Sequence, residues 1–191
     1  MFLILHGWQG SDAPHWQAWL ARQLEQAGQR VSFPALPNRD TPRREEWLAA
    51  LHDEMRAGAD AAQPVTIVCH SLSVPLWLHY IARHPDTRVG RVLLVAPPGW
   101  TALDDFRDEI IDFMPVPLDA GAVVRAAGET RLVCSDGDPY CIEGAHHLYG
   151  EALDIAVDKL PRAAGHVNVD GGFGPWPAAL EWCLGTRARL T

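Results

Sequence analysis

The sequence predicts an α/β protein, a three-layer α/β/α sandwich built around a mostly parallel sheet of about six strands. Short apolar runs alternate along the chain with longer amphipathic ones, which is the pattern of repeated strand–helix units. The apolar runs are rich in Val, Ile and Leu, and this composition is typical of strands that are buried on both faces of a parallel sheet.

The expected strands are Phe2–Leu5, Arg30–Phe33, Val65–Cys69, Arg91–Val95 and Arg131–Cys134, with a weaker sixth near Asp158–Leu160. The expected helices are His15–Ala27, Arg43–Gly58, Leu72–Arg83, His146–Leu153 and Pro177–Leu184. The first helix has clear boundaries, because it follows Ser11-Asp12-Ala13-Pro14 and ends at Gly28. The third ends before Pro85, since a proline disfavours helical backbone in the residue before it.

The longest irregular interval, Pro97–Gly128, carries one acidic amphipathic stretch, Leu103–Met114. It follows an expected strand, and ligands of open α/β sheets bind beyond the carboxyl ends of the strands. We therefore expect this interval to lie near the ligand. The chain shows no repeat, low-complexity tract or linker, so residues 1–191 are predicted to form a single domain.

The composition of the chain limits the classes of molecule that it is expected to bind. The formal net charge of −8 disfavours nucleic acid, whose phosphates require a basic surface, and equally disfavours an anionic membrane. No apolar run approaches the roughly 18 residues of a membrane span, and the apolar amino terminus is too short for a signal peptide. We expect a small-molecule substrate and a cytoplasmic location, with no prediction of oligomeric state.

The four cysteines, Cys69, Cys134, Cys141 and Cys183, lie far apart and lack the spacing of a zinc site. Three of them (Cys69, Cys134 and Cys183) have apolar neighbours, which indicates buried, reduced thiols. No HExxH or comparable ligand pattern occurs either, so a metallohydrolase is disfavoured and no metal or cofactor is expected.

The segment Val68-Cys69-His70-Ser71-Leu72-Ser73 joins an expected strand to an expected helix. Its serine is flanked two residues away on each side by small residues, which is the steric requirement of the nucleophile elbow G-x-S-x-G. Cys69 and Ser73 replace the two glycines, so the written motif is absent. On these residues alone, a turn whose serine caps a helix is an equal alternative.

A serine nucleophile needs a base and an acid that orients the base, and in elbow-type enzymes both follow the serine along the chain. Asp136 and Asp138 both follow an expected strand; Asp138 is favoured because Gly137 suits a sharp turn and Pro139 biases Asp138 towards extended backbone. Among nine histidines, His166 is the candidate base, since it alone lies in a late, glycine-rich loop. Structural turns remain the alternative for each.

Acyl transfer also needs donors for the developing oxyanion. The backbone N–H of Leu72 is one candidate, at the start of the helix after the elbow. The N–H of Trp8 is the second, in the loop His6-Gly7-Trp8-Gln9-Gly10, where glycine allows close approach of the backbone.

With these residues, the chain resembles the small serine hydrolases of the RBBP9/YdeN family within the α/β-hydrolase superfamily. The resemblance covers nearly the whole length. Four blocks carry it: His6–Ser11 with Pro14–Gln17, the elbow Cys69–Ser73, Asp136–Tyr140, and Gly165–Asn168 running to Gly172–Pro177. It implies a Ser71-Asp138-His166 triad on a compact α/β-hydrolase fold without a large lid domain. Similar proteins usually have glycine before and after the nucleophile, so the elbow departs from the family pattern.

The function expected is hydrolysis of a carboxylic ester or related acyl bond through an acyl-enzyme. Gly7, His70, Trp100 and Trp176 are candidate pocket residues, together with Trp8 and Trp16, although Trp16 and Trp176 equally suit the core. Two alternatives remain. One is a non-catalytic binding protein on a retained scaffold. The other is Cys69 as nucleophile, which a buried strand position disfavours.

Overall fold

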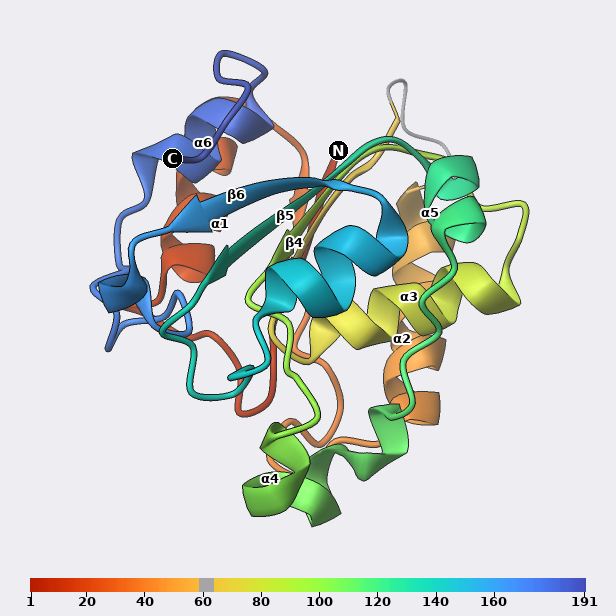
Figure 1. Cartoon of the computed structure of the whole chain (residues 1–191). Helices are drawn as coiled ribbons and strands as arrows, with labels where there is room; N and C mark the ends of the chain where they lie inside the picture. Colours follow the sequence, from red (N-terminus) through yellow and green to blue (C-terminus); the bar gives the residue numbers. More distant parts are fainter. Residues whose placement is uncertain (59–63) are drawn as a thin grey trace.

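The computed structural model describes residues 1–58 and 64–191 (Figure 1). Six strands form one sheet in the order β2-β1-β3-β4-β5-β6, and every neighbouring pair is parallel. The strands are β1 (Phe2–Leu5), β2 (Val31–Ser32), β3 (Thr66–His70), β4 (Val89–Val95), β5 (Ala127–Ser135) and β6 (Ala156–Leu160). The predicted parallel sheet is therefore confirmed.

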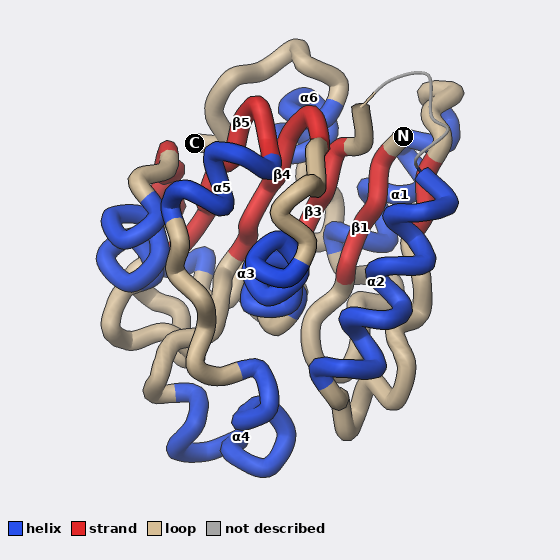
Figure 2. Tube along the Cα trace, turned by 90° about the vertical axis from the view of Figure 1, so that its right-hand side faces the viewer, coloured by secondary structure: helices blue, strands red, loops and turns tan. Residues whose placement is uncertain are grey.

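Helices cover both faces of this sheet, as Figures 1 and 2 show. The α-helices are α1 (Trp16–Gln26), α2 (Arg44–Gly58), α3 (Ser73–Arg83), α4 (Ala102–Ile110), α5 (Ala120–Ala126) and α6 (Pro177–Cys183). Three shorter helical segments are η1 (Ile111–Phe113), η2 (His146–Glu151) and η3 (Arg162–Ala164). Helices α1 and α6 pack on one face, while α2, α3 and α5 pack on the other. The three-layer sandwich is confirmed.

The two cores follow from the alternation of side chains along each strand. In β1, Phe2 and Ile4 pack with Trp16 of α1, while Leu3 and Leu5 pack with Trp47 of α2 on the opposite face. All four β1 side chains are buried. A strand that is buried on both faces has a continuous run of apolar residues in its sequence. The sequence pattern identified these strands for this reason.

Predicted and observed boundaries differ most at α5 and β5. The sequence analysis placed no helix at Ala120–Ala126 and began the fifth strand at Arg131. In the structure the Asp119 side chain caps α5 by accepting a 3.0 Å hydrogen bond from the Ala122 N–H, and the chain enters β5 directly at Ala127. The first four residues of β5, Ala-Gly-Glu-Thr, do not form an apolar run, so the hydrophobic pattern missed them.

The other corrections are smaller. The predicted stretch Leu103–Met114 divides into α4 and η1, with a kink at Phe106 whose φ and ψ are −128° and 33°. The predicted helix His146–Leu153 is helical over its whole length, but its residues His146–Glu151 form a π-helix, η2. β2 is shorter than predicted, while β3 is displaced by one residue towards the elbow.

All six strands point the same way, so their carboxyl ends meet at one edge of the sheet. The loops that leave β1, β3, β4 and β5 lie together there (Figure 1). In residues 1–58 and 64–191, no helix combines the length and the apolar character needed to cross a membrane.

Candidate active site

Ser71 lies on a sharp turn between β3 and α3, with a φ of 55°. This left-handed backbone is uncommon for a residue other than glycine, and such strained positions concentrate at functional sites. The turn is held by the Ser71 N–H, which donates a 2.9 Å hydrogen bond to the Val95 carbonyl at the end of β4. The geometry is that of a strand–turn–helix elbow that presents the serine hydroxyl.

The residues that replace the usual glycines fit this turn in different ways. Cys69 is fully buried in the core that contains α3. The Ser73 hydroxyl is also buried, and it accepts a 2.8 Å hydrogen bond from the His70 N–H and lies 2.7 Å from the Leu5 carbonyl, to which it donates. Ser73 thereby links the elbow to the end of β1. The turn therefore accommodates Ser73 with its hydroxyl hydrogen-bonded.

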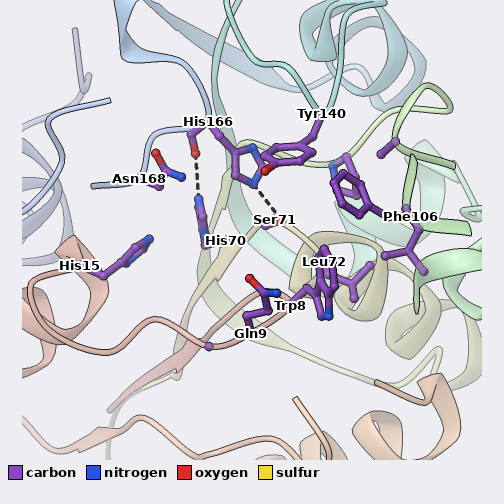
Figure 3. A pocket seen from close by; sticks show the side chains of 14 residues that line it. Trp8, Gln9, His15, His70, Ser71, Leu72, Phe106, Tyr140, His166 and Asn168 are labelled. Atoms are coloured by element: carbon purple, nitrogen blue, oxygen red, sulfur yellow. Dashed lines mark hydrogen bonds between the residues drawn. The ribbon is translucent and has the colours of Figure 1, made fainter. Parts of the chain in front are cut away.

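His166 lies between Ser71 and Asp138 and is hydrogen-bonded to both; Figure 3 shows its contact with Ser71 as a dashed line. Its Nδ1 is 2.8 and 3.0 Å from the two carboxylate oxygens of Asp138, and its Nε2 is 2.9 Å from the Ser71 Oγ. A carboxylate only accepts hydrogen bonds, so the proton of the neutral ring lies on Nδ1. This leaves the Nε2 lone pair facing the serine hydroxyl, the arrangement that a general base requires.

The two competing aspartates occupy different environments. Asp138 is 3% exposed and also accepts a 2.9 Å hydrogen bond from the Tyr140 N–H. Asp136 points to the surface, where it pairs with Lys159 at 2.9 Å, and the hydrogen bond from Lys159 lowers the pKa of its carboxyl. Only Asp138 is hydrogen-bonded to His166.

The candidate oxyanion donors flank the serine. Leu72 follows Ser71 directly, and Trp8 lies in the β1–α1 loop that borders the same pocket. Within the described residues, neither the Leu72 nor the Trp8 N–H donates to a protein acceptor, whereas the neighbouring Gln9 N–H donates to the Arg39 carbonyl at 2.9 Å. The contact between this loop and the elbow is close, because a Cβ on Gly7 would lie 2.7 Å from the Ser71 Cβ.

A pocket of about 190 Å³ opens beside Ser71. Its lining residues come from the segments that follow β1, β3, β4, β5 and β6, together with the end of β3: Trp8, Gln9, Gly10, His15, His70, Ser71, Leu72, Pro98, Ala102, Phe106, Ile110, Tyr140, His166 and Asn168. The expectation that Pro97–Gly128 lies beside the ligand site agrees with the four lining residues that this interval supplies. The volume suits a small substrate or part of a larger one.

The predicted pocket residues do not all lie in its wall. His70 does, and Gly7 lies behind the wall against Ser71. Trp100 is 41% exposed and lies outside the lining, so its assignment to the pocket was wrong. Trp176 was also misassigned: it packs in the core at 5.0 Å from the Trp16 ring, and Trp16 itself is fully buried with its Nε1–H donating to the Val167 carbonyl.

Two histidines beside His166 are neutral at pH 7. Burial lowers the pKa of His70 far below its ordinary value, and the ring Nε2 donates a 3.0 Å hydrogen bond to the His166 carbonyl. Burial also lowers the pKa of His15 to about 4, with a smaller contribution from His166. Both rings therefore contribute dipoles and hydrogen bonds near the serine, without a formal charge.

The four cysteines are all buried and free, and burial raises the pKa of each thiol above its ordinary value. Cys69 lies beside the elbow, but its side chain packs in the core between the sheet and α3, and it is not part of the pocket lining. The thiolate is the nucleophilic form of cysteine, so a raised pKa opposes Cys69 as the nucleophile.

Sequence reasoning missed several residues of the pocket wall. Tyr140 and Asn168 each lie two residues beyond a predicted triad residue, in blocks already singled out, and this proximity in a loop was the available signal. Phe106 and Ile110 belong to the acidic amphipathic stretch, whose apolar face could have been assigned to the pocket. His15 lies in the block Pro14–Gln17, but nothing in that block indicated contact with the pocket, because its position depends on how the β1–α1 loop folds back.

Comparison with known proteins identifies the family. The serine hydrolase family matches residues 2–183. The chain belongs to this family. It is a serine hydrolase with the α/β-hydrolase fold.

Among its relatives is YdeN of Bacillus subtilis strain 168, which is 25% identical over 185 residues, covering 93% of this hydrolase and 91% of YdeN. The crystal structure of the Bacillus subtilis ydeN product superimposes with a TM-score of 0.82 over 97% of both chains, at 22% identity. A YdeN-like hydrolase from Pectobacterium atrosepticum has a TM-score of 0.74 over 97% of this chain and 89% of its own, at 22% identity. Est1E of Butyrivibrio proteoclasticus, solved with ferulic acid bound, has a TM-score of 0.64 at 12% identity, over 97% of this chain and 88% of its own.

Proposed function

We propose that this serine hydrolase cleaves a carboxylic ester or a related acyl bond of a small substrate, through an acyl-enzyme on Ser71. The observation that carries the proposal is the unbroken line of hydrogen bonds from the Ser71 Oγ through His166 to Asp138, at 2.9 and 2.8 Å. The strained backbone at Ser71 and the pocket that opens beside its hydroxyl support the same assignment.

In the acylation step the Ser71 Oγ attacks the carbonyl carbon while His166 Nε2 takes the hydroxyl proton. The C=O electron pair moves onto the oxygen, which gives a tetrahedral oxyanion. When this intermediate collapses, the bond to the leaving-group oxygen breaks and His166 returns its proton to that oxygen. Asp138 holds the ring in the required tautomer and stabilises the transient imidazolium.

Deacylation repeats these steps with water as the nucleophile. His166 takes a proton from the water, whose oxygen bonds to the acyl carbon, and then returns the proton to Ser71 Oγ as the carboxylic acid leaves. We assign the oxyanion contacts to the N–H groups of Leu72 and Trp8, which have no other acceptor among the described residues. Loss of one such donor typically costs about 100- to 1,000-fold in rate.

A fluorophosphonate probe with mass-spectrometric mapping tests the nucleophile. We expect labelling of Ser71 in the native protein and none in Ser71→Ala, whose hydrolysis of a p-nitrophenyl ester should fall by about 10⁴-fold or more. Unchanged hydrolysis by Ser71→Ala, or no labelling of the folded native protein, would exclude the proposed role of Ser71.

The two aspartates give a matched pair for the role of the acid. Asp138→Asn should lose about 10³- to 10⁴-fold in kcat, because the asparagine favours the wrong His166 tautomer. Asp136→Asn should retain activity, since Asp136 contacts Lys159 at the surface. Equal losses in the two variants would contradict the assignment of Asp138.

We further propose that residues 1–191 act as one domain, because the pocket draws on residues from Trp8 to Asn168 around a single sheet. A cytoplasmic location stays a prediction from the sequence.

A further inference from the structure

The pocket has two chemically different ends, one on each side of the Ser71 hydroxyl (Figure 3). The polar end is lined by the side chains of His15, His70 and Asn168. The apolar end is lined by Trp8, Leu72 and Phe106, and Phe106 belongs to α4, which also supplies Ala102 and Ile110 to the lining. Among the described lining residues there is no Asp, Glu, Lys or Arg. An uncharged ligand with one polar and one apolar part matches this lining.

His15 presents a hydrogen-bond donor at the polar end. Its Nδ1 accepts a 3.2 Å hydrogen bond from the Gln17 N–H at the start of α1. The neutral ring therefore carries its proton on Nε2. Figure 3 shows the ring directed towards His70 and Asn168.

Asn168 presents a second donor beside it. The Gly171 N–H is shared between the backbone carbonyl of Asn168, at 3.1 Å, and the side-chain Oδ1, at 3.3 Å. This contact fixes the oxygen of the amide on the loop side and directs the NH₂ group towards His70 (Figure 3). The polar end thus offers donors from two side chains to an oxygen acceptor.

The position of His166 indicates which end receives the leaving group, because this residue must return its proton to the leaving-group oxygen. Asn168 follows His166 by two residues, and the His70 and His166 rings lie 5.0 Å apart, so the polar end adjoins the general acid. The apolar end is formed by the side chains of Leu72 and Trp8, whose N–H groups are the proposed oxyanion donors. The acyl group therefore belongs there.

On the basis of the proposed function, we infer that the substrates are neutral esters of a short apolar acid with an alcohol that carries a further oxygen. The acyl chain lies against Trp8, Phe106 and Ile110. The second oxygen of the alcohol accepts hydrogen bonds from His15 Nε2 and Asn168 Nδ2. The volume of about 190 Å³ limits the acyl chain to a few carbons.

Matched ester pairs test the two ends separately. On the leaving-group side, 2-methoxyethyl butyrate and n-butyl butyrate differ only by an ether oxygen in place of a methylene. We expect the methoxyethyl ester to have about 5- to 10-fold higher kcat/KM, the combined value of two modest hydrogen bonds. On the acyl side, n-butyl pentanoate should be preferred over n-butyl 3-methoxypropanoate, because an ether oxygen in the apolar end would lose its hydration.

Variants connect these preferences to particular side chains. Asn168→Leu removes one of the two donors at similar volume and should reduce the methoxyethyl preference to about 2- to 3-fold, the part that remains from the His15 donor and from alcohol reactivity. Val169→Ala is the control in the same loop, since Val169 is exposed and outside the pocket lining, and it should keep the full preference. Phe106→Ala should shift the optimum acyl chain to greater length.

The outcomes separate this inference from the proposed function. If Ser71 is labelled by the fluorophosphonate and esters are hydrolysed, but neither pair is discriminated or the preferences are reversed, the assignment of the two ends is wrong while the esterase function stands. Retention of the methoxyethyl preference by Asn168→Leu would also overturn it. If no ester is hydrolysed and Ser71 is not labelled, the proposed function itself fails.

Discussion

Two strand-to-helix connections meet at the nucleophile, and they are held in place differently. The β3–α3 elbow has two residues, Ser71 and Leu72, whereas the β1–α1 loop extends over residues 6–15. The elbow is fixed by the Ser71 N–H, which donates to the Val95 carbonyl at the end of β4, and by the Ser73 hydroxyl, which donates to the Leu5 carbonyl at the end of β1. The β1–α1 loop is instead held by hydrogen bonds to a second loop. The Gln9 N–H donates to the Arg39 carbonyl, and the Trp8 Nε1–H donates to the Asp40 carbonyl.

The difference indicates a division of roles. A short turn with buried hydrogen bonds can hold a strained nucleophile in one position. A longer loop supported by another loop supplies side chains for the substrate, and loops of this kind commonly carry specificity. We therefore expect changes in the elbow to affect kcat, and changes in the β1–α1 loop to affect stability or substrate preference, except where the two touch.

The largest effect is expected at that contact. In Gly7→Ala the new Cβ would lie 2.7 Å from the Ser71 Cβ and 3.1 Å from the His70 carbonyl, so the nucleophile or the oxyanion loop must move. A shift of this kind costs about 100-fold or more in kcat/KM. Ester hydrolysis and circular dichroism measure activity and folding together. Gly121→Ala, in α5 away from the pocket, is the control, and similar activities for the two variants would contradict the close contact.

The second effect concerns stability and pH in the β1–α1 loop. The pKa of His15 is about 4 in the folded protein against 6.5 for an ordinary histidine. Between these values the unfolded chain binds a proton that the folded chain does not, so the free energy of unfolding should fall as pH decreases from 6.5 to 4. The loss from this group is about 3 kcal/mol.

Urea denaturation between pH 7.5 and 4 measures this loss. His15→Gln keeps an acceptor for the Gln17 N–H but does not titrate, so its stability should decrease less steeply than that of the parent protein. His6 and His70, whose pKa values are also lowered by burial, retain their own contributions in both proteins. Parallel curves for the two proteins would show that His15 is not held neutral.

A smaller effect is expected within the elbow. Ser73→Ala removes the hydroxyl that joins the His70 N–H to the Leu5 carbonyl. We expect kcat to fall by about 10-fold with little change in KM, because a misplacement well below 1 Å costs less than about 100-fold. Ser32→Ala, at a partly buried hydroxyl in β2, is the control. An increase in KM with unchanged kcat would show that the elbow also sets substrate affinity.

The smallest effect is expected at Trp100, in the loop after β4. Its ring is exposed and outside the pocket lining, so Trp100→Ala should change kcat/KM by less than about 2-fold. A larger change in kcat/KM would mean that the connection between β4 and α4 also contributes to catalysis or substrate binding.

The sequence predicted those features that depend on local chemistry. Apolar runs identified the strands, and Gly137 and Pro139 distinguished Asp138 from Asp136, because both effects act over a few residues. α5 was missed because seven residues that include Gly121 and two valines have a weak helical tendency.

The pocket wall was less predictable for a different reason. Trp100 and Trp176 were chosen by residue type, whereas contact with the pocket depends on how distant loops pack. Phe106, Tyr140 and Asn168 come from three different loops or helices that converge only in the fold. Spacing along the chain carries no information on such distances.

The four buried cysteines can be used to detect which parts of the chain unfold, because each becomes accessible to reagents only when its surroundings open. Because their pKa values are raised and their sulfur atoms are enclosed, alkylating reagents such as iodoacetamide should modify the folded chain very slowly. Alkylation therefore requires the chain to open, and the modified cysteine identifies the part that opened. Cys183 reports on α6 and Cys141 on the loop after β5, so mass spectrometry of partially alkylated protein would resolve local opening on either side of the sheet.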